Sequence, residues 1–243
     1  MPDDILIFVA IGFFAQLVDG ALGMAFGVLT TTSLLALGVP PAAASAMTHA
    51  TEVFTTVASG ISHTYRRNVD WRLVARLAPA GMIGGAIGAY LLTMVDGRAI
   101  TPFISLYLIA IGIYIIVKAF GPLWPREVRD WIVPYVGFGG GILDAAGGGG
   151  WGPIVTSSLI GRGHNPRTVI GSTNLTEFLV TLIISTVFIL ALGWTEIRAA
   201  LGLIIGGVLA APVGAYVASW LPVRPLMIAV GIVIIISSAV RFF

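Results

Sequence analysis

The fold is decided by the stretch Gly139-Gly140-Gly141-Ile142-Leu143-Asp144-Ala145-Ala146-Gly147-Gly148-Gly149-Gly150-Trp151-Gly152-Pro153, which places eight glycines and one carboxylate inside a long apolar run. Each glycine in a helix interior costs about 1 kcal/mol relative to alanine, so the stretch predicts a helix break. Within lipid, irregular backbone is tolerated only where it is buried in protein or lines a wet cavity. We therefore expect a broken or re-entrant membrane segment beside a polar cavity.

The chain as a whole is too apolar for a soluble domain. Of its 243 residues, 57% are hydrophobic and 10% are charged, whereas soluble proteins carry roughly 25% charged residues. We expect an all-α polytopic protein of the cytoplasmic (inner) membrane, in contact with lipid. A net charge of +2 gives no argument for nucleic acid. With three histidines and no cysteine, we expect neither a structural metal site nor a cofactor.

Several apolar runs reach the roughly 20 residues that a membrane helix needs. Short connections rich in glycine, proline and charge separate them. The runs cover residues 5–36 (interrupted near Asp19), 42–64, 72–95, 99–119, 131–161 (interrupted near Asp144), 166–192, 196–220 and 223–242.

The chain contains an internal repeat. Residues 12–56 align without a gap on 137–181, at an offset of 125, and 15 of these 45 positions are identical. Apolar bias alone would not match two aspartates, two glutamates and the turn residues in one register. The repeat predicts two homologous halves of four segments each, 1–120 and 131–243, joined by a connecting loop at 121–130.

The orientation of the halves follows from their basic residues, which favour the cytoplasmic side. If all eight segments cross, the best arrangement puts 9 of the 13 basic residues inside. If each interrupted first segment enters and returns, the halves are antiparallel and 10 of the 13 lie inside. The pieces of each interrupted segment are also too short to span alone, at 1.5 Å rise per residue. We therefore favour an inverted repeat over a parallel one.

Four acids lie inside the apolar runs, whereas every basic residue lies in or near a loop. The acids are Asp19, Glu52, Asp144 and Glu177. A charge at bilayer depth costs roughly 2.5–3.5 kcal/mol on insertion scales, so such residues are functional candidates. The alternative is that each is a neutral, hydrogen-bonded carboxyl that ties helices together. Their occurrence as two symmetric pairs favours function.

The second segment of each half carries one polar stripe at helical spacing. Its members are Ser45, Thr48, His49, Glu52, Thr56 and Ser59 in the first half and Thr173, Asn174, Glu177, Thr181 and Ser185 in the second. Hydroxyls bonded to their own helix would explain scattered residues of this kind, but not a stripe centred on an acid. His49 could carry a proton. Because its counterpart Asn174 cannot titrate, the alternative is that both side chains act only as neutral hydrogen-bonding groups.

Hydroxyl residues follow each glycine break. If helices restart after Gly27 and Gly152, their first amides and positive dipole ends would form an anion site that needs no basic side chain. The alternative is that the glycines only permit tight helix crossing. The candidate substrate- and ion-binding residues are Asp19, Gly23, Thr31, Thr48, His49, Glu52, Asp144, Gly148, Gly149, Gly150, Thr156, Ser157, Thr173, Asn174 and Glu177.

The third segment of each half carries small residues at helical spacing. They are Gly81, Gly84, Gly85 and Gly88, and Gly202, Gly206, Ala210 and Gly214. Such a pattern lets helix backbones approach closely, so we interpret it as packing.

The glycine-rich stretch from Gly137 to Pro153, followed by Ile170-Gly171-Ser172-Thr173-Asn174-Leu175-Thr176-Glu177-Phe178, resembles the TauE/SafE sulfite exporter family of 4-toluene sulfonate uptake permeases. The resemblance covers essentially the whole chain, including its duplication. It implies movement of sulfite, sulfonates or related organosulfur anions across the cytoplasmic membrane. The first copy departs from the glycine-rich pattern over residues 22–28.

These observations predict a secondary transporter whose small sulfur-containing anion binds between the halves. The four acids would hold a coupling proton or cation. Four acids and no buried base are an unusual lining for an anion path, so a proton- or metal-cation transporter is the alternative. An enzyme is the least favoured class, because the sequence shows no nucleophile–base pair. An oligomer is compatible with the sequence.

Overall fold

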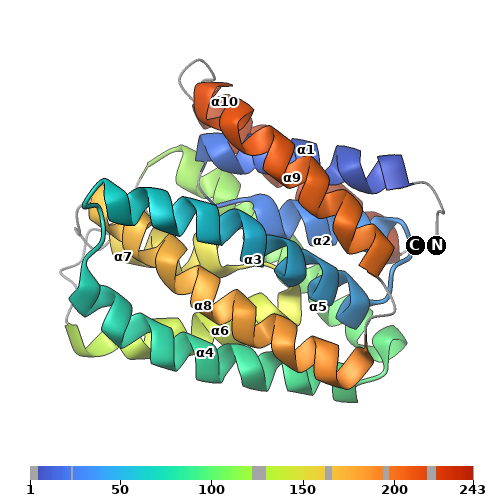
Figure 1. Ribbon diagram of the computed structural model, residues 1–243. Coiled ribbons are helices and arrows are strands. Elements are labelled where there is room, and N and C mark those ends of the chain that lie inside the picture. Colours follow the sequence, from blue (N-terminus) through green and yellow to red (C-terminus); the bar gives the residue numbers. More distant parts are fainter. Residues whose placement is uncertain are drawn as a thin grey trace.

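The computed structural model describes residues 5–22, 24–121, 130–161, 166–193, 197–217 and 223–242, and every regular element in these ranges is helical (Figure 1). The elements are α1 (Ile5–Leu22), α2 (Phe26–Ala36), α3 (Pro41–Tyr65), α4 (Trp71–Met94), α5 (Gly97–Ala119), η1 (Asp130–Ile132), α6 (Val133–Gly147), η2 (Trp151–Thr156), α7 (Ser157–Gly161), α8 (Pro166–Leu192), α9 (Ile197–Val217), α10 (Val223–Ala239) and η3 (Val240–Phe242).

The first segment of each half is interrupted, as the glycines predict. In the first half α1 ends at Leu22 and α2 begins at Phe26; we call this interruption the first break. In the second half α6 ends at Gly147, and the chain resumes at Trp151 as a π-helical turn, η2, that continues into α7. We call this interruption the second break. Both predicted interruptions are therefore confirmed.

The surface and interior have the polarity of a multi-pass membrane protein. Four stretches are long and apolar enough to cross a bilayer: Trp71–Met94, Gly97–Ala119, Thr168–Leu192 and Arg224–Phe242. Large apolar side chains such as Phe103 and Leu190 are exposed, whereas threonines, serines, His49, Glu52 and Asp144 are buried. This arrangement places apolar groups against lipid and polar groups inside the bundle.

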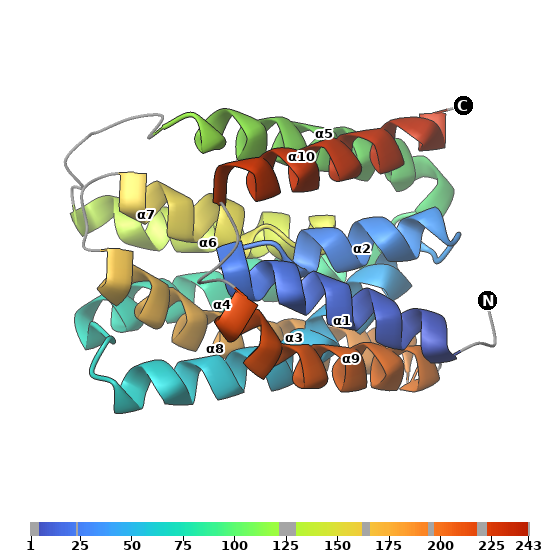
Figure 2. The same cartoon turned by 90° about the horizontal axis from the view of Figure 1, so that it is seen from above.

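The helices of the two halves are interleaved. The first helix of each half packs along the third helix of the other half, so α1 lies on α9 and α6 lies on α4. The two second helices, α3 and α8, pack on each other, as do α5 and α10 (Figures 1 and 2). Figure 2 also shows that α1 begins at the end of the molecule marked N and α2 returns to that end. In contrast, α6 begins at the opposite end and α7 returns to it.

Glycines make the α4–α6 and α1–α9 crossings possible. A Cβ at Gly84 in α4 would overlap the carbonyl oxygen of Phe138 in α6, and one at Gly206 in α9 would overlap the carbonyl oxygen of Val9 in α1. The backbones therefore touch at these points, where no larger residue fits. The interpretation of the small-residue pattern as packing is confirmed.

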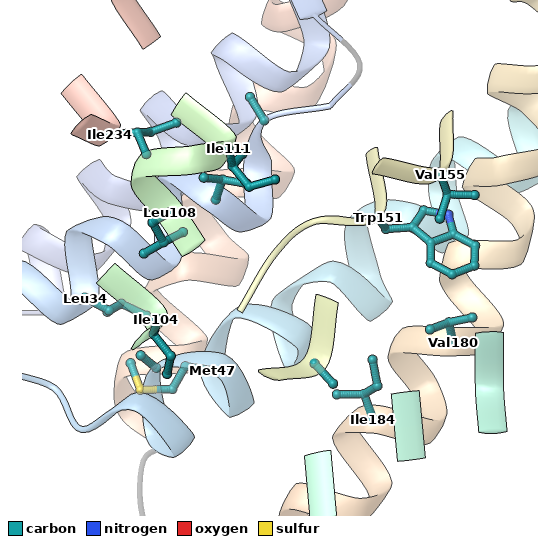
Figure 3. Packing of buried hydrophobic residues seen from close by; sticks show 14 of the residues in the cluster. Leu34, Met47, Ile104, Leu108, Ile111, Trp151, Val155, Val180, Ile184 and Ile234 are labelled. Carbon is teal, nitrogen blue, oxygen red and sulfur yellow. The ribbon is translucent and has the colours of Figure 1, made fainter. Parts of the chain in front are cut away.

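Two groups of buried apolar side chains flank the breaks (Figure 3). One joins α2, α3, α5 and α10, and the other joins η2 to α8. The first group includes Leu34, Met47, Ile104, Leu108, Ile111 and Ile234, and the second includes Trp151, Val155, Val180 and Ile184. Their burial holds the restarted helices in position between the longer ones.

The crossings give a matched test of stability. We expect Gly84→Ala to lower the stability of the purified protein by about 1–3 kcal/mol, because the added methyl group must displace backbone. Gly139 in α6 is the control, since a Cβ there meets nothing within 4 Å. Gly139→Ala should leave stability unchanged or raise it by up to about 1 kcal/mol. Thermal unfolding in lipid nanodiscs measures both; equal melting temperatures for the two variants would contradict the account.

Candidate functional site

Asp19 caps the helix that restarts after the first break. Its Oδ1 accepts hydrogen bonds from the main-chain N–H of Ala25 at 2.7 Å and of Phe26 at 3.1 Å. The first amides of a helix have no partner within the helix, and a carboxylate also interacts favourably with the positive end of the helix dipole. One carboxylate at the end of α1 therefore stabilises the start of α2.

Asp144 plays the same part at the second break. Its Oδ1 accepts the main-chain N–H of Trp151 at 2.9 Å, and its carbonyl oxygen accepts the amides of Gly148 and Gly149. Gly148 has φ 70° and Gly149 has φ 144°. These conformations favour glycine, so the chain can turn back within a few residues. Trp151 stands 125 positions after Phe26, so the two caps are related by the repeat.

The caps change the expected anion site. The sequence predicts restarts after Gly27 and Gly152 with free first amides, but the chain resumes at Phe26 and Trp151. The amides of Ala25, Phe26 and Trp151 there donate to an aspartate. This prediction is wrong for these three amides, because the acid that ends each helix folds back on the next. Within the described chain the amides of Gly27 and Val28 remain without an acceptor.

Paired threonines fasten each restarted helix to the second helix of its half. The hydroxyls of Thr31 and Thr48 lie 2.9 Å apart, and those of Thr156 and Thr173 lie 3.0 Å apart. The two pairs occupy equivalent positions of the repeat. Thr31 also donates to the carbonyl oxygen of Gly148, which links the first half to the second break. These hydroxyls are buried and engaged with protein.

A cavity of about 420 Å³ lies between the two breaks. Both halves contribute to its wall: α1, α2 and α3 from the first, and the second break, η2, α8 and α9 from the second. Its lining includes Gln16, Asp19, Met24, Phe26, Gly27, Val28, Glu52, Ser59, His63, Gly150, Trp151, Gly152, Pro153, Asn174 and Glu177. The cavity is large enough for a small organic ion with part of its hydration water.

Three acids reach this cavity. Asp19 already accepts two amides, whereas Glu52 is only 4% exposed and its Oε2 has no hydrogen-bond partner. Glu177 lines the cavity from α8. An unpartnered buried carboxyl oxygen is costly, so Glu52 is an acceptor that a proton, a cation or a substrate donor would satisfy.

His49 connects Asp144 with Glu52. Its Nδ1 lies 2.8 Å from the carbonyl oxygen of Ser45, which can only accept, so Nδ1 carries a proton. Its Nε2 lies 3.3 Å from Asp144 Oδ2 and 4.0 Å from Glu52 Oε2. A hydrogen bond between Nε2 and Oδ2 requires a second proton, held by the imidazole or by the carboxyl. The His49–Asp144 pair thus lies beside the unpartnered oxygen of Glu52.

The structure brings only part of the predicted set to the cavity. The predicted residues that line it are Asp19, Glu52, Gly150, Asn174 and Glu177. Those that lie behind the wall are Thr31, Thr48, His49, Asp144, Gly148, Gly149, Thr156, Ser157 and Thr173. Gly23 lies outside the described residues. The polar stripe of α3 is therefore divided: Glu52 and Ser59 line the cavity, whereas Thr48, one turn before Glu52, contacts Thr31 of α2.

Four residues of the site were missed by the sequence reasoning. Trp151 is fully buried, and its Nε1 donates to the carbonyl oxygen of Thr173 at 3.2 Å, so it fixes η2 on α8. The Tyr107 hydroxyl donates to the carbonyl oxygen of Gly149 at 3.1 Å. Gln16 and Met24 line the cavity. For Trp151 the repeat contained a signal, because the equivalent position of the first half, Phe26, is also aromatic.

The described part of the chain contains no group of three histidine, aspartate or glutamate side chains that could hold a metal ion. What the geometry offers is a polar cavity inside an apolar bundle, walled by two interrupted helices. This combination is typical of secondary transporters, which bind solute at broken helices near the middle of the bilayer.

Comparison with known proteins gives the same class and names the family. The family model described as Sulfite exporter TauE/SafE matches residues 8–241. The chain therefore belongs to the TauE/SafE family of membrane transporters. It is also 37% identical over 245 residues to the probable membrane transporter protein YtnM of Bacillus subtilis, and the match covers 97% of this chain and 81% of that protein. No solved structure gives a significant match.

The caps predict which aspartate variants fold. Asparagine keeps the oxygen that accepts the amides and caps helices about as well as aspartate, so Asp19→Asn and Asp144→Asn should keep the wild-type melting temperature. Asp19→Leu and Asp144→Leu should each lose about 1–2 kcal/mol. Thermal unfolding in nanodiscs measures the four variants. The capping role is refuted for any site where the leucine variant is as stable as the asparagine variant.

Proposed function

We propose that this chain is an ion-coupled secondary transporter that moves a small sulfur-containing anion, such as sulfite or a sulfonate, across the cytoplasmic membrane. The observation that carries the proposal is the cavity between the two breaks. Family membership supports a sulfur oxyanion as substrate. A volume of about 420 Å³ suits a sulfonate with a short organic group.

We further propose that the two halves form an inverted repeat across this cavity. The support is threefold. Each interrupted segment starts from its own end of the molecule and returns to it (Figure 2). The packing of α1 on α9 repeats that of α6 on α4. In the sequence, an inverted arrangement also assigns 10 of the 13 basic residues to one side of the membrane, which by the positive-inside rule is the cytoplasmic side.

The substrate contacts follow from the wall of the cavity. The amides of Gly27 and Val28 at the start of α2 are donors without an acceptor in the described chain, and both residues line the cavity. Asn174 also lines it; its side-chain amide donates one N–H to the carbonyl oxygen of Ile170 at 3.0 Å and has a second N–H to offer. Sulfite and sulfonate oxygens accept hydrogen bonds from such groups at the start of a helix. The anion would therefore lie at the N-terminus of α2, facing α8.

The coupling ion in this proposal is a proton. Glu52 and Glu177 would carry it in the cavity, and the His49–Asp144 pair would supply it, since His49 Nε2 lies 4.0 Å from the unpartnered Oε2 of Glu52. A protonated Glu52 removes the negative charge that would repel an anion. Substrate and proton would then enter the cavity together.

Uptake by reconstituted vesicles tests this function. Wild-type protein should accumulate sulfite or a sulfonate in response to a pH gradient. Glu52→Gln and Glu177→Gln should each lower gradient-driven uptake by at least about tenfold, because glutamine cannot take up or release the coupling proton. Asp96→Asn is the matched control: Asp96 is an exposed cap of α5, and asparagine preserves the cap. Unaltered uptake in both glutamine variants would remove these acids from the mechanism.

A second candidate function is the transport of a metal cation. It is favoured by the same unpartnered Glu52 oxygen, together with Asp19 and Glu177 in one cavity. Three ionised carboxylates would repel an anion and attract a divalent cation. The two functions differ in the charge of the ligand that stabilises the protein.

A thermal-shift screen separates the two candidates. A ligand that binds only the folded state raises stability by RT ln(1 + [L]/Kd), which is about 2.7 kcal/mol at 100 times its Kd. We expect sulfite or a sulfonate to raise the melting temperature at pH 5–6, where carboxyls are more often protonated. Sodium chloride at equal ionic strength is the control. Stabilisation by divalent cations alone would refute the anion substrate and establish the alternative.

A further inference from the structure

Lys118 is the one lysine in the sequence, and its side chain turns into the protein. It lies in the last turn of α5, where the sequence places it among the loop-side charges. In the structure its Nζ donates to the hydroxyl of Ser157, at the start of α7, and lies 3.8 Å from the sulfur of Met24 at the first break. The expectation that no basic side chain reaches the interior is therefore wrong.

This placement leaves the ammonium group poorly satisfied. A lysine near the end of a membrane helix ordinarily extends its charge towards interfacial water. Lys118 is only partly exposed, and of its three N–H donors one reaches an oxygen acceptor. Among the described residues no carboxylate lies within 4.0 Å of it, since the ion pairs found there all involve His49. A buried charge without a counter-ion is unfavourable, so this position favours an anion.

Met24 separates this ammonium from the cavity. Its side chain lines the cavity, and its sulfur lies 3.8 Å from Lys118 Nζ and 3.9 Å from Ser157 Oγ. Methionine is unbranched and adopts several conformations at low cost. A change of rotamer at Met24 would therefore join the Lys118–Ser157 pair to the cavity without any movement of the helices.

The repeat provides an internal comparison. Thr32 stands 125 positions before Ser157, and a basic residue of the other half, Arg241, reaches it. Arg241 donates to the Thr32 carbonyl oxygen at 3.4 Å, to Ser105 at 3.1 Å and to Ser238 at 2.8 Å. Its guanidinium is thus occupied by three protein oxygens and fastens helices together. Lys118 occupies the corresponding place with donors to spare.

We propose that Lys118 and Ser157 form an anion-binding subsite behind Met24, which takes the sulfite or sulfonate group of the substrate as it passes between the cavity and the end of the molecule where α5 ends. The ammonium supplies the charge. The Ser157 hydroxyl, which now donates over 3.4 Å to the carbonyl oxygen of Gly152, would turn to the anion as a second donor. The subsite would also supply the positive charge that an anion needs beside a cavity lined by acids. The identity of the anion rests on the proposed function; the presence of an anion site does not.

The sequence allows a test on the wild-type protein. An amine-acylating reagent can modify only Lys118 and the terminal amino group of the chain, so the latter is an internal reference. The protein in nanodiscs is acylated with and without sulfite, a short alkyl sulfonate, sulfate or phosphate, and the Lys118 peptide is quantified by mass spectrometry. A bound anion should slow acylation of Lys118 about tenfold at ten times its Kd, since the free fraction of sites equals 1/(1 + [L]/Kd). The reference amine should be unaffected.

The outcomes separate the subsite from the proposed function. Protection by sulfite or a sulfonate supports both. Protection by phosphate or sulfate alone supports the subsite and refutes the proposed substrate. If no anion protects Lys118, or if the reference amine is protected equally, the subsite is refuted, whatever the uptake assay shows.

Variants provide the second arm of the test. Lys118→Arg keeps the charge and should retain transport, whereas Lys118→Met should raise the KM for the anion about tenfold or more, as expected for loss of a charge-assisted hydrogen bond. The control is Arg98→Met, which removes an exposed charge from the other end of α5. An unchanged KM in a folded Lys118→Met protein would overturn the proposal.

Discussion

The structure depends on one requirement: main-chain amides freed inside a lipid-facing bundle must find acceptors within the protein. The chain is interrupted twice, and at each break an aspartate from the end of one helix accepts the first amides of the next. Asp19 and Asp144 thus make the breaks possible. Because these carboxylates hold the helix starts in place, an open cavity can persist between two restarted helices instead of collapsing.

The two breaks are related by the repeat but are not identical. The second is built from glycines with positive φ, closed by Trp151 and held by Tyr107, whereas the first is walled by Met24 and Phe26. His49 in the first half corresponds to Asn174 in the second, so an imidazole stands in one half where the other has an amide that cannot titrate.

Much of this architecture could be predicted from the sequence. The density of glycines predicts the two breaks, and the repeat at an offset of 125 predicts two homologous halves. The small residues of α4 and α9 predict that these helices pack closely against their neighbours. The interleaving of α1 with α9 could not be predicted, because a periodic pattern shows which face is buried but not its neighbour. The caps and the inward turn of Lys118 were missed for the same reason: each depends on residues brought together by the crossings.

The central claim is that solute binds between the two breaks. The most direct measurement is a structure of the protein in lipid nanodiscs with a saturating sulfonate that carries a heavy atom. The account predicts ligand density in the cavity bounded by Gly27, Gly152 and Glu177, with the sulfonate oxygens towards the start of α2. Ligand density elsewhere in the bundle, with this cavity unchanged, would contradict it.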